Sequence, residues 1–443
     1  MVCEAKEGVG FYRPRQPQET PFYQLVERFY PTFKRVYEER YRERYGFWRA
    51  IIGRTVEKFQ ECGDLQQGFA RVRCPKCRHE FFVAYSCRGR CFCPSCHQKR
   101  ALQTAFWVSH EVCASVPHRQ FVFTIPKRLR IYFRFDRQLL GKLCRAAWQV
   151  VRQVYAAASD HPEAVPGMIG AIQTFGDLVH FHPHIHALVS EGIFLPEGTF
   201  VPLPKLATEP FLKLWEQEVF KLLLIEGKIT DEIVANIRSW QHSGFSVDQS
   251  VRVEAKDTEG LQRLIQYFLR CPFSQARMIE VTGEGKVIYK TGGNRLGRFP
   301  KAASEDLQAG SKRNFQVFDP LDFLAEVTQH IPDPGEHLIR YYGFYSNKSR
   351  GLRTKKQGKA ASPAARNPVA APSAKEARKR WAALIKQVYE IDPLICPKCF
   401  GQMKIIAFIE RDQTEVIEKI LRHCGLWEQA PARAPPSETA AVG

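Results

Sequence analysis

The chain has 443 residues, of which 44% are hydrophobic and 25% are charged, a composition typical of a globular protein of two or three domains. Its formal net charge of +19 favours a polyanionic partner such as nucleic acid. The sequence contains no apolar run near the roughly 18 residues of a membrane span, and no signal-peptide pattern at its start. We therefore expect a cytoplasmic protein with no membrane partner.

The first predicted elements are helices. Over residues 20–59, aromatic and aliphatic side chains recur about one turn apart, which predicts amphipathic helices that pack through this face. We assign residues 1–60 to a helical lead-in and residues 61–105 to a cysteine-rich domain. Helical sequence continues from residue 99 to residue 116.

The cysteine-rich domain carries the spacing of a zinc site. Fourteen cysteines without an export signal favour metal ligands over disulfides. Fifteen residues separate the knuckles Cys74-x2-Cys77 and Cys93-x2-Cys96, and paired knuckles at this spacing close one tetrahedral zinc site. Four thiolates leave no open position, so we interpret the zinc as structural, in a basic module that faces phosphates.

Further ligands lie in or beside this cluster, so a second zinc ion is an open alternative. They are Cys62, Cys87, Cys91, His79 and His97.

Residues 106–347 alternate strand-like and helix-like segments. Residues 168–174 and 178–189 form a predicted hairpin that breaks at Gly176-Asp177. The remaining predicted elements are strands at 120–125 and 250–255 and helices at 136–158, 210–225, 230–240 and 258–270, with Asp136 as the N-cap of the first helix. This order predicts an α+β domain in which helices cover an antiparallel sheet.

The second strand of the hairpin contains His182-Pro183-His184-Ile185-His186. Side chains at positions i and i+2 of a strand share a face and lie roughly 6.5 to 7 Å apart. Neutral imidazoles at this spacing can hold one divalent ion, so His184 and His186 form a predicted metal half-site. His182 lies about 13 Å from His186 by strand rise, unless Pro183 kinks the strand. The third ligand stays open, with Gln262 and Gln266 as alternatives.

A tyrosine lies on the polar side of the predicted helix at 258–270. Five apolar residues form a single stripe along this helix, and Tyr267 lies about 130° from the stripe centre. Arg263 and Arg270 are near Tyr267 on the polar face. A phenol beside two guanidinium groups suits attack on a phosphodiester, because the arginines neutralise the phosphate.

The C-terminal part begins with a basic segment. Residues 348–380 contain eleven Lys or Arg residues and one Glu, with an Ala/Pro-rich run, which predicts a weakly ordered linker that contacts phosphates. Residues 381–443 form a predicted short module with Cys396-x2-Cys399, half of another zinc site, which His423-Cys424 could complete.

These motifs together resemble the HUH endonuclease transposases of rolling-circle insertion sequences, including the ISCR-type elements with an N-terminal zinc-binding domain. The resemblance covers most of the chain. It rests on the segments 68–74, 86–100, 117–126, 172–176, 182–186, 267–272 and 340–343.

The resemblance implies an HUH endonuclease domain over residues 106–347, with Mg²⁺ or Mn²⁺ on His184 and His186 and Tyr267 as nucleophile. Some members carry a second tyrosine four residues earlier, where this chain has Arg263, so it resembles a single-tyrosine member. The implied reaction joins Tyr267 to a 5′ phosphate of single-stranded DNA and releases a 3′-OH. A later 3′-OH reverses the step and joins strands.

The implied partner is single-stranded DNA, at insertion-sequence ends and at the target site. A homo-oligomer is compatible with this function. The implied location is the bacterial cytoplasm, in association with the nucleoid. Two alternatives stay open at this point. A plasmid replication initiator or relaxase would use the same chemistry, whereas a non-catalytic zinc-dependent DNA-binding regulator would need neither His184 nor Tyr267.

Overall fold

The structure, a computed structural model, describes residues 16–176, 178–281, 286–290, 315–356 and 394–427. Its largest unit is built on an antiparallel sheet with the order β13-β4-β5-β3-β8, in which β9 also pairs with β3. The strands are β3 (His118–Thr124), β4 (Gly167–Phe175), β5 (Phe181–Ser190), β8 (Ser246–Asp248), β9 (Arg252–Val253) and β13 (Ile339–Gly343). The hairpin predicted from the sequence forms the pair β4–β5 at the centre of this sheet.

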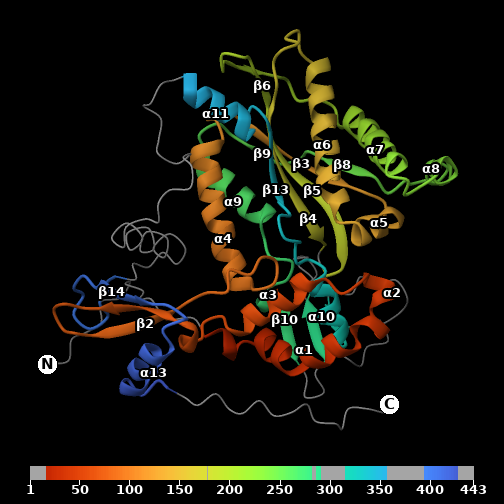
Figure 1. Ribbon diagram of the computed structural model, residues 1–443. Helices are drawn as coiled ribbons and strands as arrows, with labels where there is room; N and C mark the ends of the chain where they lie inside the picture. Colours follow the sequence, from red (N-terminus) through yellow and green to blue (C-terminus); the bar gives the residue numbers. More distant parts are fainter. Residues whose placement is uncertain (1–15, 177, 282–285, 291–314, 357–393, 428–443) are drawn as a thin grey trace, which may run out of the picture.

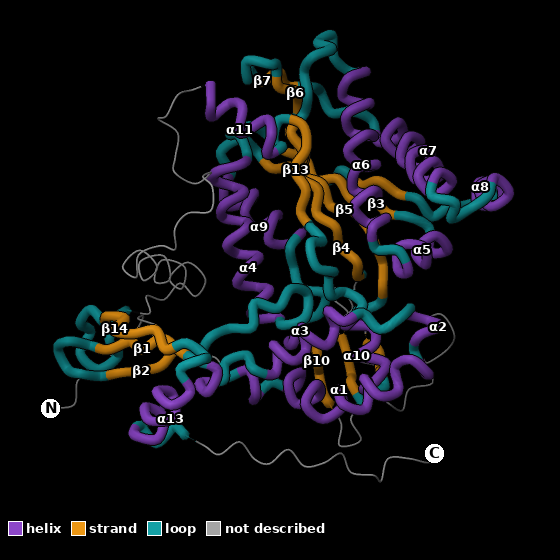
Figure 2. The backbone as a smooth tube through the Cα atoms, viewed as in Figure 1, coloured by secondary structure: helices purple, strands orange, loops and turns teal. Residues whose placement is uncertain are grey.

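Helices cover both faces of the sheet (Figures 1 and 2). One face packs against α5 (Arg130–Phe135), α6 (Gln138–Ala157) and α7 (Thr208–Ile225). The other face packs against α4 (Pro94–Trp107) and α9 (Thr258–Phe268). The predicted α+β class, with helices on an antiparallel sheet, is therefore confirmed.

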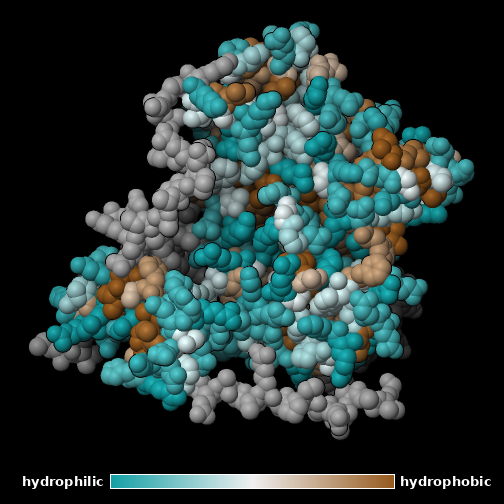
Figure 3. Space-filling model, viewed as in Figure 1, coloured by the Kyte–Doolittle hydropathy of each residue, from teal (hydrophilic) through white to brown (hydrophobic). Residues whose placement is uncertain are grey.

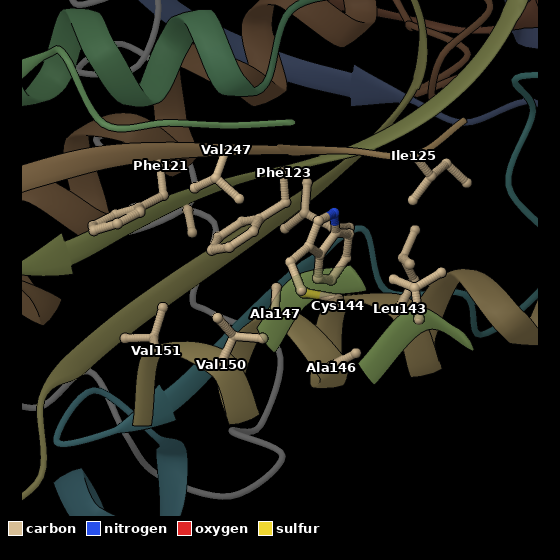
Figure 4. Close-up of a cluster of buried hydrophobic side chains, with 14 of the residues drawn as sticks. Phe121, Phe123, Ile125, Leu143, Cys144, Ala146, Ala147, Val150, Val151 and Val247 are labelled. Carbon is tan, nitrogen blue, oxygen red and sulfur yellow. The ribbon is translucent and has the colours of Figure 1, made fainter. Parts of the chain in front are cut away.

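The larger core lies between the sheet and α6. Figure 4 shows Phe121 and Phe123 of β3 facing Ala147, Val150 and Val151 of α6. Buried apolar residues recur along α6 at helical spacing, which explains why the segment forms an amphipathic helix. The helix begins two residues after the predicted N-cap Asp136, whose carboxylate accepts a hydrogen bond from the Gln138 N–H at 3.2 Å.

The lead-in helices are α1 (Pro21–Arg40), α2 (Arg42–Tyr45) and α3 (Ala50–Gln60). They share a core with a small sheet of β10 (Met278–Val281), β11 (Val287–Lys290) and β12 (Phe315–Phe318), and with α10 (Pro320–Thr328). Part of the segment assigned to residues 106–347 thus packs with the lead-in helices. The aromatic stripe of α1 signalled a packing face without revealing its distant partner.

A third unit is a ribbon of three strands with the order β14-β1-β2. It consists of β1 (Phe69–Arg73), β2 (Glu80–Ala84) and β14 (Lys404–Ile409), with α13 (Thr414–His423) packed beside it. The C-terminal segment was assigned to a short module of its own, and its described residues 394–427 pack with this ribbon. Strand β14 pairs antiparallel with β1, so this segment joins the sheet of the cysteine-rich domain.

Two further helices and a two-stranded sheet belong to the described part of the chain. They are β6 (Gly192–Phe194), β7 (Phe200–Pro202), α8 (Asp231–Arg238) and α11 (Asn347–Lys356). Helix α11 occupies the start of the segment predicted as a basic linker, and residues 357–393 lie outside the described part.

On the face shown in Figure 3 the surface is mainly hydrophilic, with apolar side chains gathered at the ribbon and near α7 and α8. Within the described ranges, no helix has the length and apolar character that crossing a membrane requires.

Candidate active site and cysteine clusters

Strand β5 brings the predicted histidine pair together on the sheet face that α9 covers. The Nε2 atoms of His184 and His186 lie 3.1 Å apart. Both side chains are buried, with 7% and 3% of their surface exposed. The two imidazoles therefore converge on one point, as two ligands of a single ion would.

His182 extends this pair into a row. The register of β5 against β4 shifts between Gln173 and Phe175, so β5 carries an extra residue beside Pro183, and such a bulge accommodates proline. The ring centroids of His182 and His184 are 5.3 Å apart. No group of three or more metal-binding side chains in the described ranges includes these histidines with all ligand atoms within 4.8 Å of one another.

The three imidazoles are neutral at physiological pH. Burial lowers the pKa of His184 to about 4, and the nearby Arg270 and Arg130 act in the same direction. Burial likewise lowers the pKa of His186 to about 2 and that of His182 to about 3. The Nδ1 atom of His184 lies 2.9 Å from the His182 carbonyl oxygen. Because Nδ1–H donates to this carbonyl, Nε2 keeps the lone pair that a metal ion would use.

Helix α9 positions Tyr267 against the histidine pair. The Asp257 side chain caps the helix by accepting a hydrogen bond from the Gly260 N–H at 2.8 Å. The Tyr267 side chain is 45% exposed, and its ring meets the His186 ring edge-on at a centroid distance of 5.5 Å and an angle of 82°. The structure thus brings together the predicted nucleophile and one predicted metal ligand.

Side chains from other elements fix the end of α9. Gln173 Nε2 donates to the carbonyl oxygens of Tyr267 and Phe268 at 3.2 and 2.7 Å. His97 Nε2 donates to the Leu269 carbonyl at 2.7 Å, since its Nδ1 accepts a hydrogen bond from the Cys91 N–H at 2.9 Å. The last carbonyls of a helix have no partner within it, so these bonds anchor the tyrosine-bearing turn to β4 and to α4.

The arginines near Tyr267 differ in their surroundings. The Arg270 guanidinium carbon lies 4.7 Å from the centroid of the Tyr267 ring. Arg263 forms an exposed ion pair with Glu259 at 3.5 Å instead. Arg130, which the sequence did not single out, affects the pKa of His182 and His184 as a positive charge. The charges around the histidines are therefore cationic, as a phosphate site requires.

Two glutamines that the sequence analysis missed contact this site. Gln120 Nε2 lies 3.2 Å from His186 Nδ1, and Gln173 is paired with His184 across β4 and β5. Gln120 lies far from the histidine motif in sequence, and the predicted hairpin did not include the register that pairs Gln173 with His184. Gln262 and Gln266, the alternatives for a third ligand, lie half-buried on α9.

The cysteines form two clusters, and their composition corrects the predicted pairing. In each cluster the four sulfur atoms lie within 4.8 Å of one another. The first cluster consists of Cys62, Cys87, Cys93 and Cys96, and the second of Cys74, Cys77, Cys396 and Cys399.

The two knuckles predicted to close one site therefore belong to different sites. Knuckle spacing identifies two ligands in one turn but not the other two, and here the pairing of β14 with β1 brings the distant knuckle to Cys74 and Cys77. The expected completion of the C-terminal half-site by His423 and Cys424 is wrong for the same reason.

Other predicted ligands have different surroundings. Cys91 is buried but belongs to neither described cluster. The His97 ring forms hydrogen bonds with the Cys91 N–H and the Leu269 carbonyl oxygen. His79 is absent from the two clusters found among the described side chains.

Two family models and two known proteins are similar to this chain. The family described as "Putative transposase" matches residues 167–352, and the family described as "Transposase zinc-binding domain" matches residues 32–125. The transposase for insertion sequence element IS801 of Pseudomonas savastanoi pv. phaseolicola is 25% identical over 382 residues, which cover 82% of this chain and 85% of that protein.

A second relative is the putative transposase y4qJ of Sinorhizobium fredii (strain NBRC 101917 / NGR234). It is 24% identical over 401 residues, which cover 85% of this chain and 94% of that protein. No solved structure matches.

Proposed function

Because the chain belongs to the transposase family that includes the IS801 transposase and carries a transposase zinc-binding domain, we propose that it cleaves and rejoins single-stranded DNA through Tyr267. The proposal assigns it to the HUH endonucleases, acting on rolling-circle insertion-sequence ends and a target strand. One observation carries it: the exposed Tyr267 phenol stands against the buried His184–His186 pair, with Arg270 beside its ring.

The chain's own residues account for the transfer. The Tyr267 oxygen forms a bond to the phosphorus, and the bond from phosphorus to the 3′ oxygen of the neighbouring nucleotide breaks. The proton lost by the phenol balances the one gained by the departing 3′-OH. Arg270 neutralises the phosphate, and its guanidinium is held over the Tyr267 and Phe175 rings at 4.7 and 5.4 Å. Attack by a 3′-OH reverses the step and joins strands without ATP.

His184 and His186 fit a divalent ion because both imidazoles are neutral and their Nε2 atoms converge. Bound Mg²⁺ or Mn²⁺ would polarise a phosphate oxygen. The His182 carbonyl orients the His184 ring, as outer contacts do at metal sites, and Gln120 contacts the His186 ring. Mg²⁺ and Mn²⁺ prefer oxygen ligands. Phosphate and water oxygens would therefore complete the coordination of an ion held by the two imidazoles.

We propose that each cysteine cluster holds one structural zinc ion. A tetrahedral site with Zn–S bonds of 2.3 Å places its sulfurs about 3.8 Å apart. The Cys62–Cys96 and Cys87–Cys96 sulfur distances are 3.7 and 3.6 Å. In the second cluster the Cys74–Cys399 and Cys77–Cys396 distances are both 3.5 Å. Metal analysis should find about two zinc ions per chain, and a chain without zinc would contradict this assignment.

The test of the proposed reaction uses labelled single-stranded oligonucleotides of random sequence. The intact chain, stripped of loosely bound metal and supplied with Mn²⁺ or Mg²⁺, should form a covalent adduct on a denaturing gel. Tyr267→Phe should keep DNA binding and lose the adduct, because only the attacking oxygen is removed. A non-catalytic regulator would bind DNA and give no adduct with either chain, which would overturn the proposal.

A further inference from the structure

A cavity of about 320 Å³ lies beside the end of α9. Residues of α4, β4 and β13 form its walls together with the last turn of α9, and the loop that holds Cys91 closes one side. Phe268 and Arg270 line the cavity, and these two residues also contact the His186 ring and the Tyr267 ring. The cavity therefore adjoins the proposed reaction centre without containing its nucleophile.

The walls present aromatic surfaces. Trp107 of α4 and Tyr341 of β13 both line the cavity and meet edge-on at a centroid distance of 5.9 Å. Phe175 lines it at the end of β4. Nucleobases stack on such surfaces when they leave a strand.

The polar groups of the cavity complement a nucleotide. Gln173, which is 2% exposed, uses its Nε2 to hold α9, whereas its buried Oε1 has no hydrogen-bond partner in the described part of the chain. Arg90, Arg100 and Arg270 line the cavity, and none of its described lining residues is acidic. The unpaired acceptor suits a ligand with an N–H donor, and the arginines suit a ligand with an attached anion. A nucleotide has both, since every base offers an N–H and each nucleotide a phosphate.

We propose that this cavity receives the unstacked base of a nucleotide next to the phosphate that Tyr267 attacks. The inference rests on the proposed function and adds a base-recognition site to it. Trp107 and Tyr341 provide stacking, the Gln173 oxygen accepts from the base edge, and the arginines meet the flanking phosphate. Taking the base out of the strand exposes its hydrogen-bonding edge.

The test compares filled and open cavities. Thr104 lines the cavity from α4 and is half-buried, so Thr104→Phe fills the space, and Thr104→Val is the matched control that keeps its volume. Both changes are combined with Tyr267→Phe to prevent cleavage. Strands that bind tightly are selected from a random single-stranded pool, and an abasic residue is then placed at each position in turn.

Loss of one particular base should weaken binding about tenfold or more in the open-cavity chains, by the stacking it removes. The same change should have almost no effect in Thr104→Phe, whose cavity admits no base. Equal penalties in Thr104→Phe and Thr104→Val, or the absence of any sensitive position, would overturn the proposal.

A second measurement needs no filled cavity. With 2-aminopurine at the sensitive position, binding should quench its fluorescence in the Tyr267→Phe chain through stacking, and Trp107→Leu should restore it. Unchanged fluorescence on binding would count against the cavity. These readouts measure binding, so they can succeed where adduct formation fails. If the adduct forms but loss of no base weakens binding, only the cavity proposal is contradicted.

Discussion

The two faces of the central sheet differ in what they contribute, although the same strand supplies both. Ile185 and Ala187 of β5 are fully buried in the apolar core with α6. His184 and His186 alternate with them and face α9. Because successive side chains of a strand point to opposite faces, one strand can place an apolar core directly behind the proposed metal-binding pair. The core face should therefore determine stability and the histidine face activity.

The largest expected effect is on the histidine face. His184→Ala and His186→Ala should each reduce cleavage by about 10²-fold or more. Binding of single-stranded DNA should change little, because it depends on phosphate contacts and stacking. Adduct formation and filter binding on the same strand separate the two effects. Cleavage at the unmodified rate in either variant would place the metal elsewhere.

The opposite result is expected one residue away. Ile185→Ala should lower the free energy of unfolding by about 2 to 5 kcal/mol, because it leaves a cavity in a fully packed core. The folded fraction should still form adduct at the normal rate. Denaturant unfolding of this variant beside His184→Ala measures the contrast. If Ile185→Ala abolished the adduct in folded protein, the division between the faces would fail.

The cysteine clusters extend the contrast beyond the sheet. Cys96 of the first cluster precedes His97, whose hydrogen bond to the Leu269 carbonyl anchors α9. Cys399 belongs to the second cluster, at the three-stranded ribbon. Cys96→Ser should release one zinc and lower adduct formation by about tenfold. Cys399→Ser should also release one zinc but change cleavage by less than about threefold. Zinc content and adduct yield measured together test this, and equal losses of activity would remove the distinction.

A smaller effect than at the histidine pair is expected for His182, at the edge of the histidine row. His182 is not grouped with the other two histidines within ligand distance, so His182→Ala should reduce cleavage by less than about tenfold. Metal titration of cleavage provides the measurement. A loss of metal affinity as large as that of His186→Ala would show that the bulge at Pro183 brings a third imidazole onto the ion.

The sequence allowed much of the central sheet to be predicted, because its signals are local. The alternation around Ile185 identified β5 and its face, and the apolar stripe of 258–270 identified α9 with Tyr267 outside the stripe. These patterns depend on residues within one or two turns of each other. They do not depend on which element packs against which.

What could not be predicted depends on contacts between distant segments. Gln173 contacts α9 only because α9 packs on this face of β4. Cys396 and Cys399 join Cys74 and Cys77 only because β14 pairs with β1. The spacing within a knuckle is the same in Cys93-x2-Cys96 and Cys396-x2-Cys399, so it does not show which of them joins Cys74 and Cys77. The strand pairing does.

Mass spectrometry of the covalent adduct tests the central claim most directly. After digestion of the DNA and protein, the peptide that contains Tyr267 should carry a nucleotide through its phenol oxygen, and Tyr267→Phe should yield no nucleotide-bearing peptide. The candidate nearest in chemistry is Tyr341 of β13, which lies half-buried. A nucleotide attached there, or an adduct of unchanged yield from Tyr267→Phe, would contradict the account.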